Sequence, residues 1–292
     1  MSRQTQTALL TSRPTTIRCE DGYVLHGSSW EPRQAAIPAT TVIICPALFV
    51  RQRFYARFAG YLAGRGLRVL CLANRGMESS LAAEQRPWNH KLQHWGERDL
   101  PAIIARARHD NPGHRLFVVG HSMGGQLVAL SKASHQLDGI ITVAATHAWW
   151  GHWSWPWGLG ILAWYGGVAP LLGRGLKVFP ADRLNLGPDV ASPLVRDWAR
   201  WGRHPDYIFG PFGMEPRMDS YPGRVLAYSF TDDERLGCRA AVDALHQHYA
   251  SADLTRRHVD PAELGLKAVG HFGYFRQQTG VELWEETLRW MA

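Results

Sequence analysis

The residues with the clearest potential for chemistry form the run Gly120-His121-Ser122-Met123-Gly124, which has the pattern G-x-S-x-G. The run follows the apolar segment Arg115–Gly120 (RLFVVG), which predicts a buried strand, and opens the small-residue segment Met123–Ser134, which predicts a helix. Glycines on both sides let the backbone turn tightly, so that the serine projects alone at the edge of a sheet. The helix N-terminus behind it favours developing negative charge. This context predicts Ser122 as a nucleophile.

A serine hydroxyl is a weak nucleophile, so this chemistry requires a base and an acid that orients the base. Two later segments supply candidates, each after a predicted strand. Asp232 and Asp233 follow the strand Arg224–Phe230, and His271 follows the strand Leu254–Val259 and a short connection. The order serine, aspartate, histidine is one of the orders in which a Ser-His-Asp triad occurs along a chain. Order alone leaves either aspartate as the acid.

The elements that must position these residues alternate between strands and helices. Two short β-prone runs, Thr16–Cys19 and Tyr23–Leu25, are joined by Asp21-Gly22, which predicts a hairpin. Further strands are predicted at Thr41–Cys45, Arg68–Ala73, Arg115–Gly120, Gly139–Ala145, Arg224–Phe230 and Leu254–Val259. Helices are predicted at Phe54–Ala63, Arg98–Arg108, Met123–Ser134, Arg239–Tyr249 and Val281–Trp290. Strands that are apolar on both faces, alternating with helices, indicate an α/β fold with a parallel sheet.

This alternation stops at His147 and resumes after Tyr221. The intervening segment is rich in Gly and Pro and holds eight of the thirteen Trp residues: Trp149, Trp150, Trp153, Trp155, Trp157, Trp164, Trp198 and Trp201. The pattern predicts one α/β core, residues 1–146 and 222–292, with an inserted helical lid at residues 147–221. Within the insertion, Trp155–Gly173 is nineteen residues without a charge, about the length of a membrane span. Its glycines, Pro170 and its mid-chain position favour a surface lid over a span.

Composition excludes several classes of protein. The chain has 292 residues, a net charge of +7, 46% hydrophobic and 20% charged residues, which is ordinary for a globular protein and excludes a disordered chain. Its basic residues form no run, so the charge alone does not indicate a nucleic-acid partner. Four scattered cysteines and a polar segment from Met1 to Arg18, which lacks the apolar stretch of a signal peptide, favour a cytoplasmic location.

Histidine and cysteine spacings do not indicate a metal site. The four cysteines show no C-x-x-C spacing. The pairs His246/His248 and His147/His152 have spacings that a metal could use, but no carboxylate or third ligand accompanies them. We therefore expect surface or lid histidines and no metal.

With these motifs the sequence resembles the α/β-hydrolase superfamily, and within it the serine-aminopeptidase-like and monoglyceride-lipase-like group. The resemblance extends from about Thr16 to the C-terminus. It implies an eight-stranded, mostly parallel sheet with helices on both faces, the insertion as its lid, and no cofactor. In the family the triad acid is usually followed, after one or two residues, by an apolar position, as Asp233 is by Leu236. The resemblance therefore favours Asp233, with Asp232 as a solvated turn residue.

The resemblance also implies an oxyanion hole made by two backbone N–H groups. One belongs to Met123, the residue after the nucleophile. The other comes from the loop after the third strand, which reads Cys45-Pro46-Ala47-Leu48 where the family often has His-Gly-x. Aligning the strand ends places Ala47 in the donor position, with Leu48 as the alternative.

Two further groups are candidates for substrate binding. The insertion brings Trp149, Trp150 and Trp153 close after the strand beside the nucleophile, and some of its aromatic side chains should line an apolar pocket, although others must form its own core. Arg51 and Arg53 follow the oxyanion loop and either contact an anionic substrate or belong to a solvated helix face.

Together these features predict a serine hydrolase that cleaves an ester or thioester of an apolar acyl or aromatic small molecule through an acyl-enzyme on Ser122. An acyltransferase with the same triad is the close alternative, and a non-catalytic binding protein on the same fold is the alternative from another class. A peptidase is implied by resemblance alone, because no acidic cluster is placed to hold a free amine. The sequence does not indicate an oligomeric state.

Overall fold

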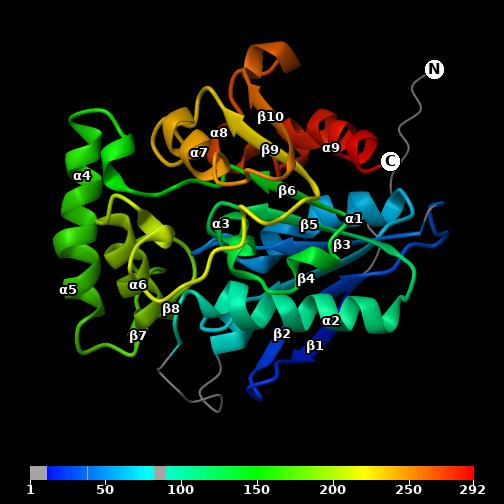
Figure 1. Ribbon diagram of the computed structural model, residues 1–292, viewed down its shortest axis with the longest axis horizontal. Coiled ribbons are helices and arrows are strands. Elements are labelled where there is room, and N and C mark those ends of the chain that lie inside the picture. The colour runs from blue at the N-terminus through cyan, green and yellow to red at the C-terminus, as the bar shows by residue number, and fades with distance from the viewer. Residues whose placement is uncertain (1–11, 38, 82–89) are drawn as a thin grey trace.

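A computed structural model describes residues 12–37, 39–81 and 90–292, so most of the segment in which we expect no signal peptide lies outside the described residues. Its centre is an eight-stranded sheet with the order β1-β2-β4-β3-β5-β6-β9-β10 (Figure 1). The strands are β1 (Arg13–Arg18), β2 (Val24–Trp30), β3 (Thr40–Cys45), β4 (Arg68–Ala73), β5 (Arg115–His121), β6 (Gly139–Val143), β9 (Arg224–Phe230) and β10 (Asp253–Val259). β1 and β2 form the predicted antiparallel hairpin, and β2 runs antiparallel to β4. From β4 to β10 every neighbouring pair is parallel. The predicted mostly parallel sheet is confirmed.

Helices cover both faces of the sheet because its central strands are apolar on both sides. Along β5, Leu116 and Val118 belong to one hydrophobic cluster, and Phe117 and Val119 belong to another, as the alternation of a strand requires. The first cluster includes side chains of α2 (Leu100–Asp110), α3 (Met123–Leu127) and α7 (Arg239–His246). The second includes side chains of α1 (Ala56–Gly64) and α9 (Gln277–Met291). Both faces are therefore shielded from water, as expected for a doubly covered sheet.

The strand order reverses between β3 and β5, which lie side by side in the sheet. Cys45 at the end of β3 is paired with Gly120 of β5, yet the chain continues from β3 to β4 on one side and from β5 to β6 on the other. Loops leaving two such strands diverge and open a crevice at their carboxyl ends. Ala47 and Ser122 follow these two strand ends, so the fold places them at the crevice.

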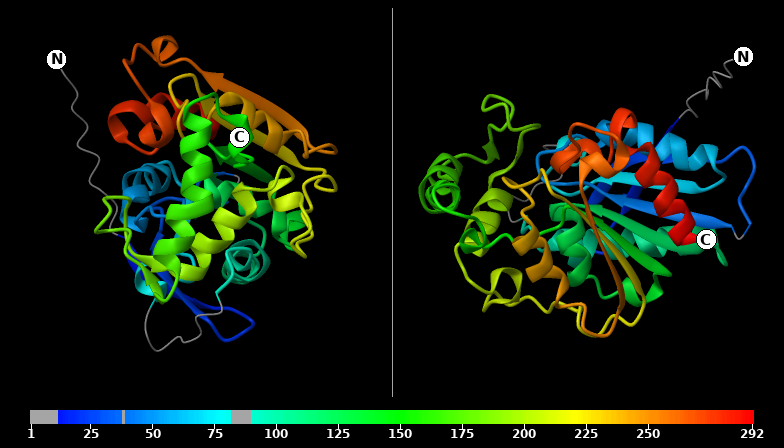
Figure 2. Two further views of the ribbon diagram at one scale, coloured as in Figure 1. Left: turned by 90° about the vertical axis from the view of Figure 1, so that its left-hand side faces the viewer. Right: turned by 90° about the horizontal axis from the view of Figure 1, so that it is seen from above.

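The insertion segment, residues 147–221, forms a separate group of elements between β6 and β9. It contains α4 (Trp157–Ala163), the π-helical turn η7 (Trp164–Val168), α5 (Ala169–Gly173), the short antiparallel pair β7 (Val178–Phe179) and β8 (Val190–Ala191), and α6 (Ser192–Gly202). These helices gather at one end of the molecule, beside the sheet (Figures 1 and 2). The uncharged stretch therefore forms α4, η7 and α5, and within the described residues no helix is both long enough and apolar enough to span a membrane.

The helix predicted from Met123 to Ser134 is shorter than expected. α3 ends at Leu127, a 3-10 turn follows at Val128–Leu130, residues 131–133 are not helical, and a second 3-10 turn begins at Ser134. The Ala129 carbonyl accepts a hydrogen bond from the Arg217 N–H (2.7 Å). Ser131 Oγ accepts from the Ala133 N–H, and such local serine bonds compete with helix continuation.

The other short helices are turns between the main elements. Among them, η1 precedes α1 without a break, so that the predicted helix at Phe54–Ala63 begins as a 3-10 turn. They are η1 (Gln52–Tyr55), η2 (Glu78–Leu81), the π-helical η3 (Trp95–Asp99), η4 (Val128–Leu130), η5 (Ser134–Gln136), η6 (Trp150–His152), η8 (Tyr207–Phe209), η9 (Pro261–Leu264) and α8 (Gly270–Gly273).

Candidate active site

Ser122 occupies the sharp turn between β5 and α3. Its backbone has φ 48° and ψ −118°, in a region that residues other than glycine rarely adopt. A Cβ atom on Gly124 would overlap the carbonyl oxygens of Cys45 and Pro46, and one on Gly120 would overlap the backbone of Gly125. The two glycines of the G-x-S-x-G pattern are thus required by close backbone contacts, which hold the serine in its strained conformation.

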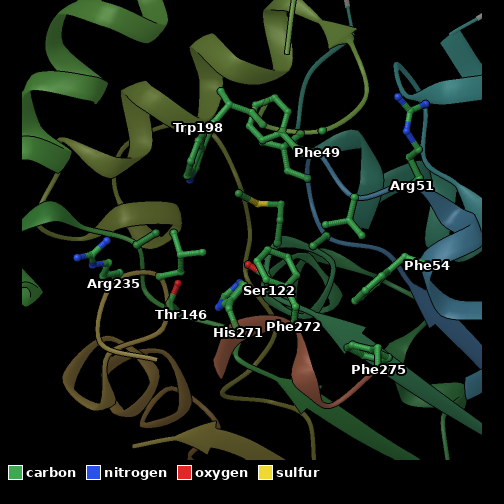
Figure 3. A pocket seen from close by; sticks show the side chains of 18 of the residues that line it. Phe49, Arg51, Phe54, Ser122, Thr146, Trp198, Arg235, His271, Phe272 and Phe275 are labelled. Atoms are coloured by element: carbon green, nitrogen blue, oxygen red, sulfur yellow. The ribbon is translucent and has the colours of Figure 1, made fainter. Parts of the chain in front are cut away.

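His271 and Asp233 meet beside Ser122. His271 Nδ1 lies 2.6 Å from Asp233 Oδ2, and both side chains are buried. Because the carboxylate accepts, Nδ1 carries the hydrogen and Nε2 of the neutral ring is free to take a proton. Figure 3 shows the imidazole of His271 next to the hydroxyl of Ser122. A Cβ atom on Gly237 would overlap Asp233 Oδ2, so the turn after β9 is closely fitted around this carboxylate.

The two neighbouring aspartates have different partners. Asp232 Oδ2 accepts from the Val269 N–H (2.8 Å), and its Oδ1 accepts from the Gly270 N–H (3.0 Å). Gly270 has φ +58°, and it immediately precedes His271. Asp232 therefore holds the main chain that leads to the histidine, whereas Asp233 holds the imidazole. This arrangement favours Asp233 as the orienting acid and gives Asp232 more than the role of a solvated turn residue.

A buried hydrogen-bond chain that sequence reasoning missed joins the loop after β3 to His271. The Ala47 N–H donates to Tyr55 Oη (2.9 Å), Tyr55 Oη lies 2.8 Å from His121 Nδ1, and His121 Nε2 lies 2.9 Å from the carbonyl oxygen of His271. Burial holds the pKa of His121 well below its usual range, so the ring is neutral. Burial also raises the pKa of Tyr55 well above its usual value. In the sequence, the position of His121 inside the G-x-S-x-G motif was the one feature that could have indicated this hydrogen-bond chain.

The hydrogen bond from Ala47 to Tyr55 affects which N–H groups are available for an oxyanion hole. The Ala47 N–H already has an acceptor in Tyr55, whereas the N–H groups of Leu48 and Met123 have none within the described part of the chain. Phe49 follows with φ +64°, so the loop turns sharply here. Leu48, Met123 and Ser122 all line one cavity. The geometry favours Leu48, the alternative, over Ala47 as the partner of Met123.

That cavity has a volume of about 1060 Å³ and is predominantly apolar. His271 also lines it, and four tryptophans of the insertion segment contribute to it: Trp153, Trp157, Trp164 and Trp198. Trp198 and Phe49 stand on one side of Ser122 in Figure 3. Of the tryptophans expected to bind substrate, Trp153 therefore lines the same cavity as Ser122. Trp149 instead lines a second cavity of about 370 Å³, and Trp150 is not among the described residues that line either cavity.

Five arginines line the main cavity, where sequence reasoning had singled out two. They are Arg51, Arg53, Arg57, Arg235 and Arg276. Arg51 Nη2 is paired with Asp182 Oδ1 (2.8 Å), so its charge already has a partner at the surface. The missed arginines come from α1 and from the loops beside Asp233 and His271, and only the folded chain brings these segments together.

The histidines considered as metal ligands take part in hydrogen bonds. His147 Nδ1 lies 2.9 Å from His152 Nε2. The expectation of a surface or lid residue is wrong for His246, which is buried against the sheet and bonded to Thr142 Oγ1 and to the Val242 carbonyl. Within the described ranges, no group of three or more His, Cys, Asp or Glu residues could hold a metal ion.

Residues 36–192, more than half of the chain, match the sequence family described as serine aminopeptidase, S33. The chain belongs to this α/β-hydrolase family. As a member of it, the protein is a hydrolase with the expected fold. No curated protein sequence matches the chain significantly.

Solved structures agree on the fold. A monoglyceride lipase from Saccharomyces cerevisiae superposes with a TM-score of 0.63 at 14% identity, covering 97% of this chain and 95% of its own. An esterase from Exiguobacterium antarcticum has a TM-score of 0.62 at 15% identity, with 95% and 99% covered. DcsB, solved with a substrate analogue, has a TM-score of 0.64 at 12% identity, with 96% and 99% covered. At these identities the likeness shows the shared architecture, and activity must be argued from the site.

Proposed function

We propose that the protein hydrolyses carboxylic esters or thioesters of apolar acyl or aromatic substrates through an acyl-enzyme on Ser122. The observation that carries this proposal is the 2.6 Å contact between His271 Nδ1 and Asp233 Oδ2, beside Ser122 in the wall of a large apolar cavity. A nucleophile, a base and an acid that orients the base are the parts that acyl transfer requires. The esterase and the monoglyceride lipase with similar folds are consistent with an ester as substrate.

In this proposal His271 Nε2 takes the proton of the Ser122 hydroxyl as its oxygen attacks the ester carbonyl. The Leu48 and Met123 N–H groups then donate to the oxyanion of the tetrahedral intermediate. His271 returns the proton to the leaving alcohol or thiol, and a water molecule hydrolyses the acyl-enzyme by the same steps in reverse order. Asp233 keeps the imidazole in the required tautomer throughout and stabilises its positive charge.

The insertion segment acts as the lid in this proposal, over a core made of residues 1–146 and 222–292. Its support is that Trp153, Trp157 and Trp164 line the same cavity as Ser122. Apolar and aromatic walls are typical of pockets that bind apolar groups. Trp149, whose ring centroid lies 6.0 Å from that of Trp150, supports the insertion from outside this cavity.

A cytoplasmic location remains part of the proposal, on the evidence of the cysteines. Cys19, Cys45, Cys71 and Cys238 are all free thiols. Free thiols are typical of proteins from reducing compartments.

The test is turnover and labelling of the wild-type protein and of Ser122→Ala. p-Nitrophenyl esters of increasing chain length and acyl-CoA thioesters serve as substrates, and a fluorophosphonate serves as the covalent probe. We expect Ser122→Ala to lose labelling and to reduce kcat by about 10⁴-fold or more. Ser220→Ala, at an exposed serine of the insertion segment, is the matched control and should retain both. Labelling that persists in Ser122→Ala would contradict the proposal, and a wild-type protein that is not labelled would indicate a binding protein.

A further inference from the structure

The charges that line the main cavity are all of one sign. Five arginines contribute to its wall, and no aspartate or glutamate does so among the described residues that line it. Arg51 is paired with Asp182, and the guanidinium of Arg235 lies over the ring of Trp157, 5.4 Å from its centroid. Two of the five are thus held by contacts with the insertion segment.

The other three lack an acidic partner in the described part of the chain: Arg53, Arg57 and Arg276. Arg57 Nη1 donates to the neutral amide of Gln277 (3.0 Å). Glu78 lies close to the start of η1, but its carboxylate accepts from the Gln52 N–H (2.7 Å) and does not line the cavity. All three side chains are exposed, so solvent rather than a protein carboxylate meets their charge.

These three residues share one wall, which we call the arginine wall. Arg53 and Arg57 are four residues apart on η1 and α1, which follow one another without a break, so they lie near the same face. Arg276 precedes Gln277, the partner of Arg57. The ring of Phe54 joins the two segments, because its centroid lies 6.1 Å from that of Phe272 and 6.2 Å from that of Phe275. In Figure 3, Phe54 and Phe275 stand on the side of Ser122 opposite Arg235.

Three neighbouring cations repel one another, and the repulsion is relieved when an anion binds between them. The planar guanidinium fork matches the paired oxygens of a carboxylate or a phosphate. We propose that the arginine wall binds an anionic group, a carboxylate or a phosphate, that is part of the substrate. The inference rests on the proposed function, since it concerns the substrate of the same site.

The placement of Ser122 defines the substrate class further. Ser122, the arginine wall and an aromatic wall formed by Trp153, Trp157 and Trp164 line the same cavity. Phe54, beside the arginine wall, and Arg235, which lies over the ring of Trp157, stand on opposite sides of Ser122 (Figure 3). A substrate that reaches both walls is an ester or thioester with an apolar group on one side of the carbonyl and an anionic group on the other. An amphiphilic, negatively charged ester fits this arrangement better than a neutral one.

The experiment measures binding, so that it does not depend on turnover. Decyl phosphate, decanoate and 1-decanol carry unbranched apolar chains of nine or ten carbons and are not carboxylic esters. By calorimetry with the wild-type protein at low salt, we expect at least one of the two anions to bind about tenfold or more tightly than decanol, and raised ionic strength to weaken that preference. Preference for decyl phosphate or for decanoate identifies the anionic group.

The double variant R53Q/R276Q removes two charges of the arginine wall. We expect it to reduce the preference for the anion over decanol about tenfold, whereas R289Q, at an exposed arginine of α9 that does not line the cavity, should retain it. Equal binding of the anion by R53Q/R276Q and the wild type would place the anion elsewhere, for example at the oxyanion donors, and would overturn the inference. The absence of any preference in the wild type would overturn it too. Neither result affects the labelling of Ser122, which tests the proposed function separately.

Discussion

The buried imidazole of His121 connects the hydroxyl of Tyr55 to the main chain of His271. A carbonyl oxygen can only accept, so His121 Nε2 carries the hydrogen that binds the His271 oxygen at 2.9 Å. Nδ1 must then accept from the Tyr55 hydroxyl at 2.8 Å, and Tyr55 Oη in turn accepts from the Ala47 N–H. Donor and acceptor are therefore fixed for each of the three hydrogen bonds. The residue before the proposed nucleophile is thus hydrogen-bonded to the main chain of the proposed base and, through Tyr55, to the loop that carries the proposed oxyanion donor.

Tyr55→Phe should therefore impair both catalysis and stability. The change leaves the Ala47 N–H and His121 Nδ1 buried without partners, which should lower the free energy of unfolding by about 1–3 kcal/mol. We expect kcat to fall about tenfold with a smaller change in KM, because the proposed base and donor loop lose a common support. Urea unfolding and ester kinetics measure the two effects.

Tyr228→Phe is the matched control. Tyr228 is also fully buried, but its hydroxyl is bonded to Thr287 Oγ1 (3.1 Å) and not to a residue of the site. Its loss should reduce stability while kcat stays near the wild-type value. If both variants retained kcat, the chain through Tyr55 would be structural only.

Exchange of the two aspartates for asparagine should separate their roles. Asp233→Asn places an amide opposite His271 Nδ1 and favours the wrong tautomer, so kcat should fall by about 10⁴-fold. Asp232→Asn keeps one acceptor for the two N–H groups of Val269 and Gly270, so we expect a loss of about 1–2 kcal/mol in unfolding free energy and a loss in kcat of tenfold or less. The reverse order of the two kcat values would assign the triad acid to Asp232.

Most of the central sheet could be predicted from the sequence because its central strands are buried on both faces. The runs at β4 (Arg68–Ala73) and β9 (Arg224–Phe230) are buried after their first arginine and have the predicted bounds. Tertiary contacts changed other bounds. The predicted helix from Met123 ends at Leu127, because the insertion segment supplies the Arg217 N–H to the Ala129 carbonyl and a local serine bond competes with the helix.

The site residues that the sequence indicated are those with a local signal. Ser122 lies in a motif, and His271 and Asp233 each follow a strand. Tyr55 and Arg276 carry no such signal, because only the folded chain brings Tyr55 to His121 and the segment of Arg276 to Arg57. The loop after β3 is a further example. Aligning the strand ends favours Ala47 as the oxyanion donor, but its N–H donates to the hydroxyl of Tyr55, eight residues further along the chain, which the alignment does not reveal.

The preference for acyl chain length should depend on Trp153. Each buried methylene contributes about 0.8 kcal/mol, so three or four added carbons should raise kcat/KM about a hundredfold over acetate esters. Trp153→Ala removes part of the cavity wall and should flatten that profile. Trp149→Ala serves as the control, because Trp149 lies outside this cavity, and its profile should remain steep. A wild-type profile that peaks at acetate would show that these tryptophans have only a structural role.

Stability should decline in mild acid because of buried neutral histidines, of which His246 is the clearest. It lies 2.7 Å from both Thr142 Oγ1 and the Val242 carbonyl, and burial lowers its pKa to about 3. In the unfolded chain the same group has a pKa of about 6.5. Between these values the unfolded state binds a proton that the folded state does not. The contribution of neutral His246 to the free energy of unfolding is therefore complete above pH 6.5. It is lost as the pH falls, by about 1.4 kcal/mol per pH unit.

Urea unfolding at pH 7, 6 and 5 measures this slope. His246→Gln should show a slope smaller by about that amount, whereas His135→Gln, at an exposed histidine with no carboxylate partner in the described part of the chain, should keep the slope of the wild type. An unchanged slope in His246→Gln would mean that other groups cause the acid sensitivity.

The contact of Gly124 with the carbonyl oxygens of Cys45 and Pro46 has a consequence for how such an enzyme can diversify. Any side chain at this position would push the loop after β3 away from the turn at Ser122, so almost no substitution can be accommodated there. The wall formed by the insertion segment is different, because Gly160 of α4 lines the cavity and a Cβ atom there would contact only the ring of Trp157, at 3.9 Å. New side chains can accumulate in that helix and reshape the cavity. A lineage of this protein can thus acquire new substrates by substitutions in the insertion segment while it inherits the reaction chemistry unaltered.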